Sequence, residues 1–290
     1  MTDHRQTTES QKRHQERARE KDSDSPLEPT ERVKAREEES LNAKITHEVI
    51  RIEGEKELAR TNAALWWAAL AGGLSMGFSL VAEGLLRAHL PDAHWRPLIT
   101  KLGYPVGFII ITLASQQLFT ENTITPIVPL LRRKTGAMLR NVGRLWAVVF
   151  AGNILGVIIF AWMLGRTELF EPNVKQAFED IGLEAIKGTF LVTLIRGVVA
   201  GWLIALMVWM LPAASSSQVA VVMIMTYLVG LGGLAHIIAG SADVLYLVAT
   251  GVAGWSTYFG FLVPALVGNV VGGLVFVSAL NHAQVATDSA

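Results

Sequence analysis

Two apolar stretches of the chain share one pattern: Gly152–Leu164 reads GNILGVIIFAWML, and Gly268–Leu280 reads GNVVGGLVFVSAL. Five residues are identical, in the order Gly, Asn, Gly, Phe and Leu, and the members of every pair are 116 residues apart. A constant offset between similar segments is the sequence signature of an internal repeat. Further upstream, the same offset sets Thr120 opposite His236.

The composition around this repeat indicates a membrane protein. Of the 290 residues, 51% are hydrophobic and 17% are charged, whereas soluble chains average about 25% charged residues. Residues 1–62 hold 28 of the 50 charged residues, so the rest of the chain is sparsely charged. The absence of cysteine excludes disulfides and thiolate metal sites, and we expect neither a metal nor a cofactor. A neutral total without a basic stripe argues against nucleic acid as a partner.

The apolar segments predict an all-α membrane protein with six transmembrane helices over residues 63–282, because a span needs about 20 mostly apolar residues. The first four are Ala63–Leu86, Gly103–Leu131, Leu145–Leu164 and Thr189–Leu211. The fifth and sixth follow, divided at Pro212–Ser217 and around Gly251–Gly254. Polar residues interrupt the second span: Gln116, Gln117, Glu121 and Asn122.

The segments on either side of the spans are predicted to be cytoplasmic. Residues 1–40 are rich in Glu, Arg, Gln and Ser, which is typical of a disordered tail. Over residues 41–62, apolar residues recur every three or four positions, which predicts an amphipathic helix: Leu41, Ile45, Val49 and Ile52. That helix lies on the membrane's inner face or on neighbouring subunits, or it is a solvated helix leading into the first span. Residues 283–290 form a short C-terminus.

The loop charges predict the orientation. The loop between spans two and three carries five basic residues and no acidic one: Arg132, Arg133, Lys134, Arg140 and Arg144. The loop 165–188 carries more acidic than basic residues. The positive-inside rule therefore places the first loop in the cytoplasm, and six spans put both termini there. We expect a multi-pass protein of the inner (cytoplasmic) membrane.

Each predicted repeat contains three spans, an odd number, so the two copies must face opposite ways across the membrane. Ala71-Gly72 in span one and Ala200-Gly201 in span four are similar pairs at an offset of 129. Inverted repeats with interrupted helices place the functional site near the midplane, where the two breaks meet. We therefore expect Thr120 and His236 to lie together at the centre.

The chemistry of this pair favours a pathway. His236 is the only histidine within a predicted span, and ionisable groups inside a bilayer usually mark a route for solutes or protons. An anion in a dry constriction loses much hydration, whereas a neutral acid loses far less. Because histidine can lend a proton or a hydrogen bond, we expect proton-coupled passage. Thr120 can also cap a half-helix, and both roles can coexist.

Four motifs in order resemble the formate/nitrite transporter family over about residues 45–282. They are Leu118-Phe119-Thr120 on the second helix, Val199–Trp209 on the fourth, His236–Ser241 on the fifth and Gly268–Gly273 on the last. The resemblance implies an aquaporin-like fold of two inverted three-helix repeats with interrupted helices two and five. It further implies a symmetric homo-pentamer in the lipid bilayer, with a pore for a small monovalent anion or its conjugate acid.

The resemblance also assigns roles to residues. Thr120 and His236 form the central polar pair, and four residues form the hydrophobic constriction: Tyr104, Phe108, Leu118 and Phe119. Two family asparagines are replaced here by Gly201 and Gly240, at positions that support the broken helices. Asn153 and Asn269 recur by symmetry, which favours hydrogen bonds to the backbone of those helices.

Four charged residues bear on selectivity: Glu121, Asp243, Arg196 and Lys187. Glu121 and Asp243 either pair with Arg196 or a protonated His236, or face the pore and change it to a path for cations or neutral solutes. Arg196 either extends outward or attracts anions into the outer vestibule. Lys187, nearer the mouth, is expected to be a solvated flank.

Two further classes of function remain open at this stage. A closed-pore scaffold or sensor would use the long tail to recruit partners. An intramembrane enzyme would use Ser241, His236 and Asp243, but these lie within eight residues on one segment, whereas catalytic triads generally draw on separate elements. We therefore expect that the chain is not an enzyme.

Overall fold

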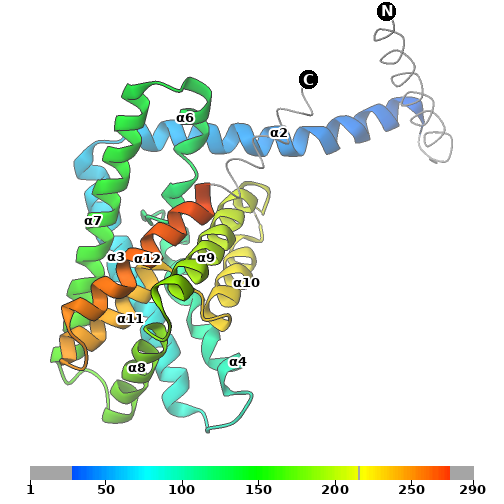
Figure 1. Cartoon of the computed structure of the whole chain (residues 1–290). Helices are drawn as coiled ribbons and strands as arrows, with labels where there is room; N and C mark the ends of the chain where they lie inside the picture. Colours follow the sequence, from blue (N-terminus) through cyan, green and yellow to red (C-terminus); the bar gives the residue numbers. More distant parts are fainter. Residues whose placement is uncertain (1–27, 215, 275–290) are drawn as a thin grey trace, which may run out of the picture. The chain divides into compact units, whose positions relative to one another are not determined.

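The computed structural model describes residues 28–214 and 216–274 (Figure 1). Most of the predicted tail, the end of the sixth span and the C-terminus 283–290 lie outside these residues. The chain divides into two compact units after Ile45, and the packing described below is that of the second unit.

The regular secondary structure of the described residues is helical. The α-helices are α2 (Pro29–Ala59), α3 (Asn62–His89), α4 (Arg96–Thr100), α5 (Pro105–Leu113), α6 (Ile127–Arg133), α7 (Gly136–Arg166), α8 (Pro172–Ala185), α9 (Phe190–Met210), α10 (Gln218–Leu231), α11 (Ile237–Thr250) and α12 (Trp255–Gly273). Short 3₁₀ turns are Lys101–Gly103, Glu121–Thr123 and Leu211–Ala214. Within residues 28–214 and 216–274, four stretches are long and apolar enough to cross a membrane: α3, α7, α9 with its 3₁₀ extension, and α12.

The two remaining predicted spans are each built from two shorter helices. The second consists of α5 and α6, and the fifth of α10 and α11. The first half of each ends in the same way, with a left-handed residue at Ser115 (φ 52°) or Gly233 (φ 56°). Two backbone hydrogen bonds close each turn. One of them runs from the amide of Gln116 to the carbonyl of Ile111 in the first turn, and from the amide of Leu234 to the carbonyl of Val229 in the second. This is the Schellman arrangement, and it ends each half-helix before the centre.

Glycines bring the long helices into close contact in two equivalent pairs, α3 with α7 and α9 with α12 (Figure 1). A Cβ atom on Gly73 would lie 2.2 Å from the carbonyl oxygen of Asn153, and one on Gly201 would lie 2.3 Å from that of Asn269. Gly73 and Gly201 are therefore the equivalent residues, at an offset of 128. The sequence alignment of Gly72 with Gly201 was wrong by one position, because it rested on the similarity of two Ala-Gly dipeptides and not on contacts between helices.

Two helices depart from the predicted boundaries. α2 begins at Pro29 rather than Leu41, because the charged segment before Leu41 consists largely of strong helix formers. The loop 165–188 contains α8, which buries Val174, Phe178 and Ile181. α8 packs against α3 and α11, so this loop covers one end of the second unit's core.

Candidate functional site

Thr120 and His236 meet in the core of the second unit. The Thr120 hydroxyl oxygen lies 2.8 Å from Nε2 of His236, and the two residues are 2% and 0% exposed. Thr120 stands in the break between α5 and α6, and His236 is the residue before α11. Each side chain thus comes from the break of a different helix.

The backbone determines which ring nitrogen of His236 carries a proton. The amide of Ala239 donates a hydrogen bond to Nδ1 at 3.1 Å, so His236 caps α11. Because an amide only donates, Nδ1 must accept, and in the neutral ring Nε2 carries the hydrogen. Nε2 then donates to the Thr120 oxygen, and the hydroxyl hydrogen of Thr120 is left to donate to a solute.

Asn153 holds the first break and Asn269 holds the second, with the same three hydrogen bonds. Asn153 Oδ1 accepts from the amide of Phe119 at 2.8 Å, and its Nδ2 donates to the carbonyls of Ala69 and Gln117. Asn269 Oδ1 accepts from the amide of Ile237 at 2.8 Å, and its Nδ2 donates to the carbonyls of Gly197 and Ala235. Unpaired backbone groups are thus satisfied at depth, as an interrupted span requires.

These contacts correct the register of the repeat. Phe119 corresponds to Ile237, so the offset at the breaks is 118 rather than 116. Leu118 is therefore the counterpart of His236, and Thr120 is the counterpart of Ile238. Thr120 and His236 meet, but they are not symmetry mates. The offset of the last helices does not extend to the breaks because the intervening loops differ in length.

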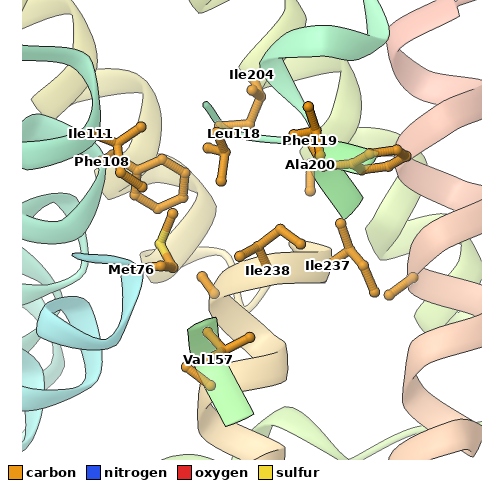
Figure 2. Packing of buried hydrophobic residues seen from close by; sticks show 14 of the residues in the cluster. Met76, Phe108, Ile111, Leu118, Phe119, Val157, Ala200, Ile204, Ile237 and Ile238 are labelled. Carbon is orange, nitrogen blue, oxygen red and sulfur yellow. The ribbon is translucent and has the colours of Figure 1, made fainter. Parts of the chain in front are cut away.

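The aromatic residues named by the resemblance divide into two groups. Phe108 packs edge-on against His236 with ring centroids 4.9 Å apart, and Tyr104 lies 5.5 Å from Phe108. In Figure 2 Leu118 lies on the side of Phe108, whereas the ring of Phe119 points away from both. Phe119 instead contacts Phe150 on α7, at 5.1 Å. Leu118 and Phe119 therefore point to different sides of the break, and Phe119 packs against α7 rather than beside Phe108.

Two cavities in the described part of the chain are lined by residues that lie close to Thr120 or His236 in sequence. The α8-side cavity, of about 260 Å³, is lined by residues that include Glu83, Lys101, Tyr104, Arg196 and Asp243. The α2-side cavity, of about 650 Å³, is lined by residues that include Glu53, Lys56, Thr112, Gln116 and Glu121.

Neither Thr120 nor His236 lines a cavity itself, but residues near each of them in sequence do. Ala235 and Gly240 lie close to His236 in sequence and line the α8-side cavity, while Gln117 and Glu121 flank Thr120 and line the α2-side cavity. Along α5, Tyr104 faces the first cavity and Ile111 the second, about 10 Å apart at the helical rise. Phe108 lies between them and is fully buried.

The predicted ion pairs of Glu121 and Asp243 are not formed among the described residues. Arg196 donates to the carbonyl oxygen of Lys187 at 2.8 Å, and both ring nitrogens of His236 have other partners. The two carboxylates lie in different cavities, so Arg196 in the α8-side cavity shares no cavity with Glu121. Lys187 is exposed, and its backbone rather than its ammonium group contacts Arg196.

The sequence interpretation missed a buried ion pair in the α8-side cavity. Glu83 on α3 is 2% exposed and pairs with Lys101. Nearby, Arg87 pairs with Glu184 at 2.8 Å. A carboxylate inside the first apolar span was the signal that could have revealed the pair, because a charge there needs a partner.

Gly201 and Gly240 contribute space rather than hydrogen bonds. A Cβ atom on Gly201 would lie 2.3 Å from the carbonyl oxygen of Asn269, and one on Gly240 would lie 2.4 Å from the Phe261 ring. An asparagine at either position would force α12 or Phe261 to move. The loss of the family's amides is therefore part of how these helices pack.

The three residues considered for hydrolysis do not form a triad. The hydroxyl of Ser241 donates to the carbonyl of Ile237 at 2.5 Å and accepts from the hydroxyl of Tyr258 at 3.2 Å. His236 is bonded to Thr120 and Ala239, and Asp243 lines the α8-side cavity.

Comparisons with known proteins agree with this architecture. The family described as "Formate/nitrite transporter" matches residues 44–283. The chain is 44% identical over 246 residues to "Inner membrane protein YfdC" of Escherichia coli (strain K12), with 83% of this chain and 78% of that protein covered. It is 26% identical over 234 residues to "Formate channel BtFdhC" of Bacillus thuringiensis, covering 77% and 88%.

The fold is also similar to solved structures. One is described as "Pentameric formate channel with formate bound", with a TM-score of 0.61, 22% identity and coverage of 77% of this chain and 97% of that one. Another, "FNT family ion channel", has a TM-score of 0.64, 18% identity and coverage of 85% and 98%. The sequence match extends over most of the chain. The chain belongs to the formate/nitrite transporter family.

Proposed function

We propose that the chain forms a pore through the inner membrane for a small monovalent solute, a formate- or nitrite-like anion or its conjugate acid. The observation that carries this proposal is the buried contact between Thr120 and His236, whose sequence neighbours line two different cavities. The proposed pathway for a small hydrogen-bond acceptor joins the two cavities across this pair. The relatives named as formate channels support the same class of solute.

The proposed topology is six spans, arranged as two inverted three-helix repeats with both termini in the cytoplasm. The duplicated contacts of Asn153 and Asn269 and the two Schellman turns support the repeat. The proposed assembly is a homo-pentamer, by analogy with the structure described as a pentameric formate channel. Residues 41–62, which include the end of α2, are proposed to lie at the cytoplasmic face.

The proposed mechanism uses donors at the centre. His236 donates through Nε2 to Thr120, and the Thr120 hydroxyl donates to the solute, with the N-terminus of α11 adding positive potential. A proton on Nδ1 would displace the amide of Ala239, so a charged ring must give up its role as a cap. Two routes to proton coupling follow. If His236 takes up the proton, the hydrogen bond from the Ala239 amide at the start of α11 must break. If the solute passes as its conjugate acid, the solute carries the proton itself.

The alternative candidate is a pore for neutral or cationic solutes. Glu121 and Asp243 favour it, because each lines a cavity and neither has an ion-pair partner in the part of the chain that the structure describes. In a salt gradient, an anion-selective pore and a cation-selective pore give reversal potentials of opposite sign, so this measurement distinguishes the two candidates.

The test is a flux assay with purified protein in proteoliposomes. Formate, nitrite, lactate, hydrosulfide and ammonium are compared, and reversal potentials are measured in a formate gradient. Formate or nitrite flux with anion-selective potentials supports the proposal. Cation-selective potentials favour the alternative, and no flux of any of the five refutes both.

A further inference from the structure

Three side-chain oxygens of residues lining the α2-side cavity are buried and make no hydrogen bond among the described residues. They are Oγ1 of Thr112, Oε1 of Gln116 and Oε1 of Glu121. Buried polar atoms in proteins nearly always have partners, so three such oxygens around one cavity need an explanation. All three residues line the same cavity, so a ligand or ordered water held there would supply the partners.

The unsatisfied oxygens are not a sign that the whole break is loosely built. The neighbouring Asn122 donates to Oε1 of Gln117 at 2.8 Å and to the carbonyl of Leu118 at 3.0 Å. The Asn122 carbonyl in turn accepts from the indole of Trp146. Gln117 and Asn122 line the same cavity, so satisfied and unsatisfied side chains lie next to one another along its wall.

The chemistry of these oxygens selects the ligand. The amide oxygen of Gln116 and an ionised Glu121 only accept, while the Thr112 hydroxyl can accept as well as donate. Such a set suits a hard cation or a cation with N–H donors, and it repels an anion. One carboxylate with two neutral oxygens suits a single positive charge better than Ca²⁺, which takes six to eight oxygen ligands.

The charges that α2 adds to the cavity point the same way. Three charged residues of α2 line it, Glu53, Lys56 and Glu57, together with Arg60 just after the helix. Glu57 and Arg60 pair with each other at 3.1 Å. Glu53, Lys56 and Glu121 then remain without an ion pair among the described residues, which leaves two carboxylates against one ammonium group.

We propose that Thr112, Gln116 and Glu121 form a subsite for a small monovalent cation in the α2-side cavity. The inference deepens the proposed function and rests on the pore being there. Glu121 follows Thr120 in the chain, so the bound cation neutralises the carboxylate nearest to the central pair. Anion passage in this chain therefore depends on a cation at the α2-side mouth.

Binding is tested on the purified full-length protein in detergent. Ammonium, sodium and potassium chloride are titrated calorimetrically against choline chloride at constant ionic strength, which separates N–H donors from alkali ions. We expect saturable binding of at least one cation, weakened about tenfold or more in Glu121→Gln. Glu184→Gln, which removes a carboxylate from the α8-side cavity, is the matched control and should bind as the unchanged chain does.

A second variant guards against misfolding. Thr112→Val removes one ligand without changing charge, and it should also weaken binding. Equal affinity in the unchanged chain, Glu121→Gln and Thr112→Val, or no saturable binding of any of the three cations, overturns the subsite.

Formate flux, measured separately in choline and in the cation that binds, distinguishes the two proposals. Flux that rises with that cation supports both. Cation binding without formate flux refutes the proposed anion pore and leaves the subsite standing. Formate flux in a protein that binds no cation overturns the subsite alone.

Discussion

Asn153 and Asn269 make the same three hydrogen bonds, one to an amide and two to carbonyls, from equivalent helices to the two breaks. Each asparagine is fully buried and ties a long helix to a broken one. These duplicated hydrogen bonds identify equivalent residues in the two halves of the chain more reliably than the identical residues of the sequence repeat do.

We expect Asn153→Ala and Asn269→Ala to destabilise the protein to a similar extent, by about 2 kcal/mol or more, because each removes three buried hydrogen bonds to backbone groups. Melting temperatures in detergent measure the effect. Asn62→Ala, which removes an exposed partner of Arg144, is the control and should have a small effect. A loss confined to one of the two asparagines would contradict their equivalence.

Substitutions in the two Schellman turns, at Ser115 and at Gly233, should change the stability of the protein in opposite directions. Ser115 holds a left-handed conformation that disfavours a side chain, so Ser115→Gly should raise stability by about 1 kcal/mol. Gly233→Ala should lower it by a similar amount. A Cβ on Gly233 would meet nothing within 4 Å, so the effect there is conformational. Thermal unfolding of both variants checks this, and shifts of the same sign would count against the assignment.

Replacing Gly201 or Gly240 by the family's asparagine should destabilise the protein. The new Cβ would overlap the Asn269 carbonyl or the Phe261 ring, and overpacking costs about 1–3 kcal/mol. Gly260→Ala is the control, since a Cβ there meets nothing within 4 Å. The measurement is the melting temperature of the purified variants. Asparagine variants as stable as the unchanged chain would show that the asparagines were not excluded by packing.

The hydroxyl of Thr120 should matter for flux. Thr120→Val removes the donor and keeps the shape, so we expect formate flux to fall about tenfold or more, while Thr120→Ser retains it. His236→Ala should reduce flux and alter its dependence on pH. Initial rates in proteoliposomes over a range of pH give the comparison. If His236→Ala leaves both the rate and its pH dependence intact, the proposed role of the histidine is wrong.

The pH dependence of stability should carry opposite contributions from two glutamates of α2. Burial, and then the neighbouring Glu57, raises the pKa of Glu53 above its usual 4.5. The folded protein therefore holds this proton more tightly than the unfolded chain, so the contribution is present below pH 4.5 and is lost as pH rises through the folded pKa. Hydrogen bonding to Arg51 lowers the pKa of Glu48, so its contribution is present above about pH 4.5 and is lost on acidification through the lower, folded pKa.

Melting temperatures from acidic to neutral pH test both signs. Glu53→Gln should gain stability relative to the unchanged chain as pH rises above 4.5, and Glu48→Gln should lose it. The assignment fails if Glu53→Gln and Glu48→Gln shift in the same direction.

The sequence by itself indicated the helical membrane class, the two broken segments and the meeting of Thr120 with His236, although the 116-residue offset used for that meeting does not hold at the breaks. These features depend on local properties, namely the length of apolar runs and the polar residues that interrupt them, together with a repeat that two short motifs make visible. The buried pair of Glu83 and Lys101 was within reach of the same reasoning, because a carboxylate in an apolar span requires a partner.

Only the tertiary structure decided which cavity each carboxylate faces, that Phe119 turns toward α7, and that the breaks are 118 residues apart. In a helix, the direction of a side chain follows from its position, but in a non-helical break it follows from individual dihedral angles and from the helices packed around it. Those helices come from distant parts of the chain, as α7 does for Phe119 and α12 does for Gly201. For Glu121 the outcome is a place beside the α2-side cavity rather than a partner in Arg196.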